Sequence, residues 1–203
     1  MTGRPFLFAF LGMALLVVFT DACAHRAYAK DFSVYTNDRD PDNHFIPSGW
    51  MGDVSDVKMN THFTGNCHTY GACVQITYSS AHALDTQSAG WAGIYWQYPA
   101  DNWGTMKEGY NLEGMTRLTF WARGEHGGEQ IDRFQVGGIQ GSYPDSTWVS
   151  IGPVILSSEW TQYSIYVGNK KLTRVIGGFG WMARADVNQK SRTFYLDQIQ
   201  FEQ

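Results

Sequence analysis

Positive charge is scarce in this sequence. Lysine and arginine together number 15 against 19 aspartates and glutamates, which gives a formal net charge of −4 at pH 7. The basic residues are not gathered into a run or a stripe. Nucleic acid and anionic membrane surfaces attract proteins through such clusters of positive charge. We therefore exclude nucleic acid as a partner.

Signatures of common catalytic sites are also missing. The sequence has no G-x-S-x-G nucleophile elbow and no E-x-D-x-x-E pattern of sandwich glucanases. The glycine-rich segments 136–139 and 176–180 lack the lysine of a phosphate-binding loop. Glycoside hydrolysis needs two carboxyl groups placed across the scissile bond. Glu125 and Glu129 lie in a glycine-rich turn and Asp132 at the next strand edge, so hydrolysis is an alternative and not the leading interpretation.

Long apolar runs are absent except near the start of the chain. The one such run, residues 6–19, follows Arg4 and precedes an A-x-A motif that ends at residue 29. A basic start, a short apolar segment and an A-x-A site are typical of a secretory signal peptide. The run is also short for a membrane span. We predict a signal peptide over residues 1–29 and one secreted or periplasmic domain over 30–203.

Cysteine is scarce as well, with three residues in the chain. Cys23 falls in the predicted leader, where an alternative processing route attaches a lipid anchor to it. Cys67 and Cys73 are expected to form a disulfide, because an exported protein folds in an oxidising compartment. His62 and His68 flank them, so a mixed histidine and cysteine metal site is the alternative. Their spacing is not that of structural zinc sites.

No segment after residue 30 carries a helical period of apolar residues. Short apolar or alternating runs recur between Gly, Asn, Asp and Ser, which is the pattern of an all-β protein. No linker or repeat divides the chain, so we predict a single two-sheet antiparallel β-sandwich. Its last strand has a phase slip at Asp197-Gln198 that a β-bulge can absorb. The expected strands span residues 32–36, 72–78, 92–98, 117–122, 133–136, 148–151, 161–167, 178–182 and 193–202.

Aromatic side chains are abundant, and one stretch, GWAGIYWQYPADNWG, concentrates them with hardly a charge. Successive side chains of a strand point to opposite faces of the sheet. This alternation places Trp91 and Tyr95 on one face, and Ile94 and Trp96 on the other. We predict that the second face is core and that the first meets solvent or a ligand. Trp103 follows in a loop after the strand.

Three further pieces resemble a known family. They read NLEGMTRLTFWARG at 111–124, EWTQY at 159–163 and TFYLDQI at 193–199. Their order and spacing resemble those of carbohydrate-binding modules with the galactose-binding-like β-jelly-roll fold. The resemblance covers about residues 110–201. It implies a jelly-roll sandwich, a non-catalytic domain and a glycan ligand.

The resemblance also implies a structural calcium ion. In such modules the ion commonly lies between the first strand and an acidic residue of the last strand, a position that Asp197 matches. Near the N-terminal side, Asp38 and Asp40 belong to the segment 37–43, which supplies oxygen ligands of the type calcium prefers. A solvated turn rich in Asp and Asn is the alternative.

Aromatic rings can bind sugars because the C–H face of a pyranose stacks on a ring while polar neighbours orient its hydroxyls. Core packing is the alternative for each ring. The resemblance implies that Trp160 opens a strand and packs, so we exclude it. The stacking candidates are Trp91, Tyr95, Trp103, Trp121 and Trp181, and the polar candidates are Gln97, Asp101, Arg123 and Gln135.

The leading hypothesis is an exported, calcium-stabilised β-jelly-roll module that binds a polysaccharide or oligosaccharide by aromatic stacking. In this hypothesis the domain performs no chemistry and can serve a separate glycan-active enzyme. Two alternatives belong to other classes: a secreted glycoside hydrolase or polysaccharide lyase, and a cell-surface module that adheres to protein.

Overall fold

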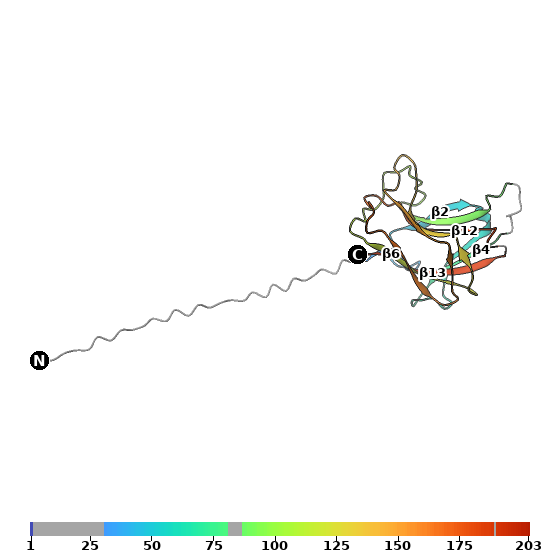
Figure 1. Cartoon of the computed structure of the whole chain (residues 1–203), viewed down its shortest axis with the longest axis horizontal. Coiled ribbons are helices and arrows are strands. Elements are labelled where there is room, and N and C mark those ends of the chain that lie inside the picture. The colour runs from blue at the N-terminus through green and yellow to red at the C-terminus, as the bar shows by residue number, and fades with distance from the viewer. Residues whose placement is uncertain (2–30, 81–86, 189) are drawn as a thin grey trace.

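The computed structural model describes residue 1 and residues 31–80, 87–188 and 190–203. β-Strands form nearly all of its regular structure (Figure 1), as the missing helical period predicts. The only helix in these ranges is a 3-10 turn, η1 (Val54–Asp56), and no helix there is long and apolar enough to cross a membrane. The predicted signal peptide, apart from its first residue, and the alternative lipid anchor lie outside the described residues.

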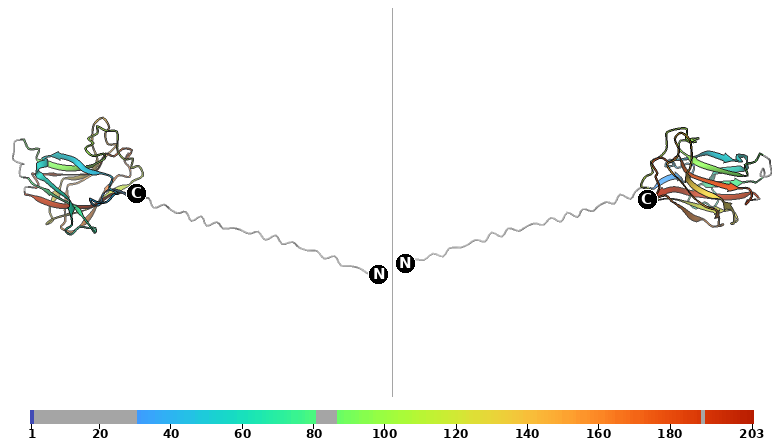
Figure 2. Two further views of the ribbon diagram at one scale, coloured as in Figure 1. Left: turned by 180° about the vertical axis from the view of Figure 1, so that it is seen from behind. Right: turned by 45° about the horizontal axis from the view of Figure 1, so that its top comes forward.

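Two antiparallel sheets form the two layers of the domain (Figure 2). Sheet A has the strand order β11-β6-β13-β4-β3, with β1 also paired to β13, and sheet B has the order β2-β5-β12-β8-β9. This confirms the predicted two-sheet antiparallel β-sandwich. The strands of sheet A are β1 (Phe32–Tyr35), β3 (Val57–Phe63), β4 (Cys73–Tyr78), β6 (Arg117–Gly124), β11 (Thr161–Tyr166) and β13 (Arg192–Glu202). Those of sheet B are β2 (Ile46–Gly52), β5 (Trp91–Gln97), β8 (Arg133–Gly137), β9 (Trp148–Ile151) and β12 (Gly177–Arg184). A separate two-stranded ribbon pairs β7 (Gln130–Ile131) with β10 (Val154–Ile155).

All nine expected strands are present, each with ends within two residues of the prediction. The prediction missed β2, β3 and the two-residue strands β7 and β10. Pro47 and Gly49 weaken the strand pattern of β2, and they are tolerated because β2 is an edge strand of sheet B. β3 is an edge strand of sheet A in which exposed Lys58 and Asn60 alternate with more buried residues. This alternation is typical of an edge strand and could have predicted β3, although most residues of the segment are polar.

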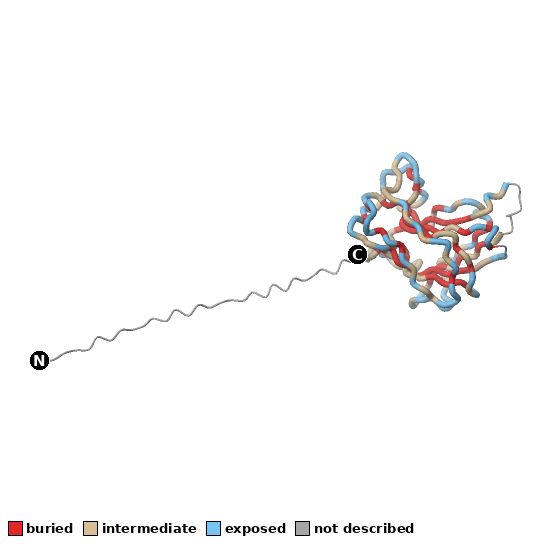
Figure 3. The backbone as a smooth tube through the Cα atoms, viewed as in Figure 1, coloured by how far each residue is buried: buried red, intermediate tan, exposed pale blue. Residues whose placement is uncertain are grey.

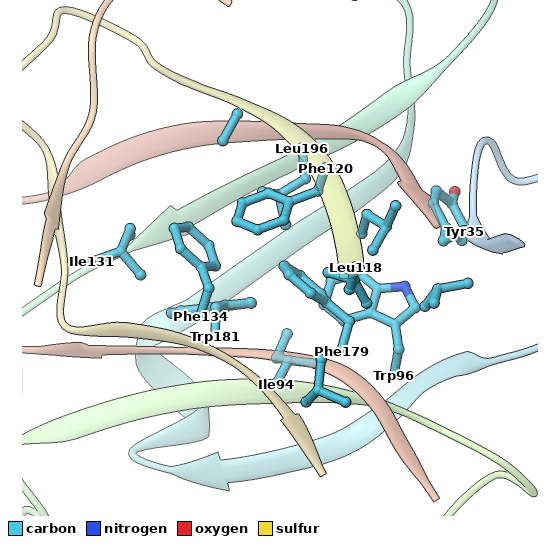
Figure 4. Close-up of a cluster of buried hydrophobic side chains, with 14 of the residues drawn as sticks. Tyr35, Ile94, Trp96, Leu118, Phe120, Ile131, Phe134, Phe179, Trp181 and Leu196 are labelled. Atoms are coloured by element: carbon cyan, nitrogen blue, oxygen red, sulfur yellow. The ribbon is translucent and has the colours of Figure 1, made fainter. Parts of the chain in front are cut away.

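The core lies between the two sheets (Figure 3). Phe120 of sheet A contacts Phe134 and Phe179 of sheet B, with ring centroids 4.7 and 5.0 Å apart. Ile94 and Trp96 of β5 are fully buried in the same cluster, which confirms the predicted inner face of that strand (Figure 4).

Trp181 is a correction to the sequence analysis, because its side chain belongs to this core. It lies between Ile94 of β5 and Phe134 of β8 in the sheet, packs edge-on against Phe194, and has no exposed surface. Figure 4 shows it pointing into the cluster. Trp181 shares strand parity with Phe179, so both rings face inward, and neither can stack on a ligand.

The predicted β-bulge and the predicted disulfide are both present. The register of β13 against β6 shifts between Asp197 and Gln200, with Gln198 at a φ of 46°. Cys67 and Cys73 are bonded, with their Cα atoms 5.6 Å apart, and they close the loop between β3 and β4.

Candidate functional site

Tyr95, Trp103 and Gln135 are the predicted site residues that the fold brings together. Tyr95 and Gln135 lie on the outer face of sheet B, in β5 and β8, and both pair with Gly180 of β12 between them. Trp103 comes from the loop after β5, and its ring meets that of Tyr95 edge-on with centroids 6.2 Å apart. The outer face of sheet B is therefore the candidate site.

Tyr95 forms the floor of this site. Glycines make room for its ring: a Cβ at Gly180 would lie 2.7 Å from the ring, and one at Gly177 would lie 3.0 Å from it. The Tyr95 hydroxyl donates a hydrogen bond of 2.8 Å to the carbonyl of Gly137, and only 5 % of the residue is exposed. Burial raises the pKa of this phenol, so Tyr95 is a neutral, fixed floor.

Trp103 is presented by a loop that Asn102 organises. The buried Asn102 side chain accepts hydrogen bonds from the backbone of Gly104 and Met106 and donates to the carbonyls of Met106 and Glu108. Its own carbonyl accepts a bond from Gln97, which ties the loop to β5. The Trp103 ring stays 39 % exposed. The hydrogen bonds of Asn102 thus fix the loop, and part of Trp103 stays open to solvent.

Trp148 joins Tyr95 and Trp103 as the third aromatic residue of the site, and the sequence analysis did not name it as a site residue. It begins β9, is 59 % exposed, and donates its indole N–H to Gln135 Oε1 at 3.2 Å. The guanidinium of Arg133 lies 5.7 Å from the centre of its ring. Strand alternation places Arg133 and Gln135 on one face, so parity was the signal that could have found this group.

Asp145 fixes the loop between β8 and β9 that borders the cleft. Its carboxylate accepts hydrogen bonds from the backbone N–H groups of Ile139, Ile176 and Gly177. Burial raises the pKa of the Asp145 carboxyl to about 6, and these bonds together with Arg174 act in the opposite direction. The carboxyl faces the protein backbone and serves to hold the loop.

The resulting cleft has a volume of about 360 Å3, within the range of about 300–1,000 Å3 found for ligand sites. Flat rings and polar side chains share its surface, which is the composition that stacks on a sugar ring and binds its hydroxyls. Arg133 is its single charged residue among the described lining residues. These are Met51, Tyr95, Trp103, Arg133, Gln135, Gly138, Ile139, Gln140 and Trp148.

Three further candidates lie elsewhere on sheet B or within it. Gln97 is fully buried and bonded to Ser48 and to the carbonyl of Asn102, so its role as a ligand contact is corrected to a structural one. Asp101 is exposed at a φ of 58°, and its backbone N–H donates to Ser48. Trp91 is partly buried at the opposite end of β5, where it pairs with Arg184. Neither lines the cleft.

Trp121 and Arg123 lie together on the outer face of sheet A, and parts of the chain cover them there. His68 of the disulfide loop stacks on Trp121 with centroids 3.6 Å apart. The guanidinium of Arg123 stacks on Tyr195 at 3.8 Å and is 8 % exposed as a residue. Trp160 donates its indole N–H to the carbonyl of Asn66 at 2.9 Å.

The disulfide loop also borders a second and larger cavity, of about 720 Å3. Its lining includes the polar residues Asp38, His62 and His68, and Tyr70 is its one tyrosine, phenylalanine or tryptophan among the described residues. We place the candidate site in the smaller cleft because stacking requires several exposed ring faces on one surface.

The carboxylates predicted to hold calcium are engaged with different protein groups. Asp197 is fully buried and accepts bonds from the backbone N–H and hydroxyl of Thr69, and burial raises its pKa. Asp38 contacts His62 at 2.9 Å, and Asp40 accepts a bond from Thr36. In the described part of the chain, no three His, Cys, Asp or Glu side chains form a metal-holding group. Calcium binding by Asp38, Asp40 and Asp197 stays a prediction, which a lower thermal midpoint in chelator would support.

No protein-family description and no curated relative matches this sequence. Solved structures do match it. A family 30 carbohydrate-binding module from a cellulosomal cellulase of Clostridium thermocellum shares 10% identity with a TM-score of 0.57, over 85% of this chain and 97% of that chain. Another family 30 module gives a TM-score of 0.59 at 10% identity, over 85% of this chain and 87% of that chain. The fold of this chain is therefore the β-jelly roll of carbohydrate-binding modules, as the resemblance implied.

Proposed function

We propose that this protein binds glycans without chemical conversion, on the outer face of sheet B. The observation that carries the proposal is the cleft in which Trp103 and Trp148 expose ring surface over the floor formed by Tyr95. Covering such a ring with the apolar face of a sugar gains about 25 cal/mol for each Å2 removed from water. Gln140 is exposed at the cleft and can supply hydrogen bonds to hydroxyl groups, whereas Gln135 is 2 % exposed and its Oε1 accepts the indole N–H of Trp148.

Binding is favoured over hydrolysis by where the carboxylates lie. Glu129 is buried and accepts a bond from the backbone of His126, and Glu125 lies near the Tyr195 hydroxyl, on the sheet A side. Asp132 holds the backbone of Arg184. These acids are absent from the described lining of the cleft, whereas hydrolysis requires a pair of carboxyls around the sugar.

Export and a separate glycan-active enzyme belong to the same proposal. The Cys67–Cys73 disulfide supports an oxidising compartment. A domain that binds a polysaccharide without cutting it can hold a separate enzyme close to that polymer. Co-precipitation of such an enzyme with the exported protein would support this part of the proposal.

Affinity electrophoresis tests the binding function. The purified domain is run in native gels that contain soluble polysaccharides, together with Trp103→Ala, Trp148→Ala and Tyr166→Ala. Tyr166 is a matched control, because its ring is 62 % exposed on β11 of sheet A. We expect retardation of the wild type and the control, and loss of retardation in both tryptophan variants. Absence of retardation by every glycan, or release of reducing ends, would contradict the proposal.

A further inference from the structure

Arg133 is unusual in the cleft because no carboxylate among the described residues forms an ion pair with it. In the part of the chain that the structure describes, its guanidinium makes no ion pair, and its only side-chain hydrogen bond goes from Nη2 to the sulfur of Met182 at 3.2 Å. Its Nε is buried without a partner. A guanidinium in this state still has unused donors, which neutral contacts with sulfur do not satisfy.

The surroundings hold this charge in place and partly remove it from water. The guanidinium lies 5.7 Å from the centre of the Trp148 ring, and its Nη2 contacts the sulfur of Met182. Charge interactions strengthen where water is excluded, and an unpaired charge in such a position carries a desolvation cost. An anion that enters the cleft would therefore gain more from Arg133 than from a solvated surface arginine.

The acids near the cleft do not neutralise Arg133. Asp132, its neighbour in sequence, accepts a hydrogen bond from the backbone N–H of Arg184, and its other carboxylate oxygen lies 3.8 Å from Arg184 Nε. Asp145 is turned toward the N–H groups of Ile139, Ile176 and Gly177. Both carboxylates are thus engaged with other groups.

We propose that the cleft selects an acidic sugar, a hexuronate unit of a glycan, whose carboxylate is bound by Arg133. The planar guanidinium matches a planar carboxylate through two parallel N–H···O bonds, which a neutral hydroxymethyl group cannot accept. Stacking on Trp103 and Trp148 would hold the sugar ring while Arg133 reads its acidic substituent. This inference rests on the proposed glycan binding and adds the chemical class of the ligand.

Overall charge cannot produce this selectivity. The chain carries a formal net charge of −4, so its long-range field repels a polyuronide. A preference for the acidic ligand would therefore be local to the cleft. It would also weaken as salt screens the contact.

Calorimetric titration with two matched hexasaccharides tests the inference. Both are β-1,4-linked; one contains glucose and the other glucuronic acid, so that they differ at C6 alone. We expect the wild type to bind the glucuronic acid hexamer at least ~10-fold more tightly at low salt, with a smaller ratio at ~0.5 M salt. Arg133→Gln should bring the ratio to about 1, and Arg133→Lys should retain part of it, because lysine keeps the charge without the fork.

Arg39→Gln is the matched control, because the Arg39 side chain is 88% exposed and lies outside the cleft. It changes net charge by the same amount and should leave the ratio unchanged. Tighter binding of the glucose hexamer by the wild type, or an equal loss of the ratio in Arg39→Gln, would overturn the inference and leave glycan binding intact. Loss of both ligands in a folded Arg133→Gln variant would also overturn it, because Arg133 would then support the cleft instead of selecting the acid. Binding of no glycan at all in the electrophoresis would overturn the proposed function itself.

Discussion

The outer faces of the two sheets carry similar side chains, but other parts of the chain cover them on sheet A and leave them open on sheet B. Sheet A displays Trp121 and Arg123, and sheet B displays Trp148 and Arg133. On sheet A, His68 stacks on the tryptophan and Tyr195 stacks under the arginine. On sheet B, Trp148 is 59 % exposed. Among the described residues, the guanidinium of Arg133 contacts the ring of Trp148 and the sulfur of Met182.

The difference comes from the loops that cross each face. The disulfide-closed loop between β3 and β4 folds over sheet A, and its Thr69 is bonded to Asp197. The loops that border sheet B are fastened by their own polar residues, Asn102 and Asp145, and leave the rings between them open. An aromatic residue on a sheet therefore indicates a binding site only when no other part of the chain covers its face.

The largest effect that separates the two faces is expected for Asn102→Ala. This change removes four side-chain hydrogen bonds that hold the loop of Trp103. We expect about 2–6 kcal/mol less stability, from about 0.5–1.5 kcal/mol for each bond. Glycan affinity should fall by roughly tenfold, because Trp103 loses its position. Denaturant unfolding and calorimetric titration measure the two effects. An unchanged affinity would show that Trp103 does not contact the glycan.

Trp121→Ala should produce a smaller effect of the opposite kind. The indole packs against His68, so its removal should cost about 1–2 kcal/mol of stability. Glycan affinity should stay at the wild-type value, because the ring is already covered. Trp148→Ala is the matched comparison and should lose affinity with little change in stability. A loss of affinity in Trp121→Ala would place a ligand on sheet A and remove the distinction between the faces.

A pH effect is expected on the sheet B side, at Asp145. Burial raises the pKa of this carboxyl from 3.8 to about 6, so in that interval the folded protein binds more protons than the unfolded chain. The stabilising contribution is then complete below pH 3.8 and is lost as the pH rises through about 6. The free energy of unfolding of the wild type minus that of Asp145→Asn should therefore decrease as the pH rises over this range. A difference that increases with pH would show that the hydrogen bonds to the ionised carboxylate outweigh its burial.

Strand alternation predicted much of the fold and less of the site. It correctly assigned Ile94 and Trp96 to the core, because both are fixed by the period of two within one strand. The same rule applied to Phe179 and Trp181 would have placed Trp181 in the core as well. Exposure of Trp103 and Trp148 could not be predicted in this way, because it depends on how loops distant in sequence pack around the two rings.

The central claim is that the ligand meets the rings of sheet B and not those of sheet A or the core. The eight tryptophan indole N–H groups provide one probe for each ring. In an NMR titration with a glycan that retards the domain, the account predicts that the indole signals of Trp103 and Trp148 shift most. Those of Trp121, Trp160 and Trp181 should stay in place. Shifts centred on Trp121 and Trp160, with Trp103 and Trp148 unmoved, would contradict the account.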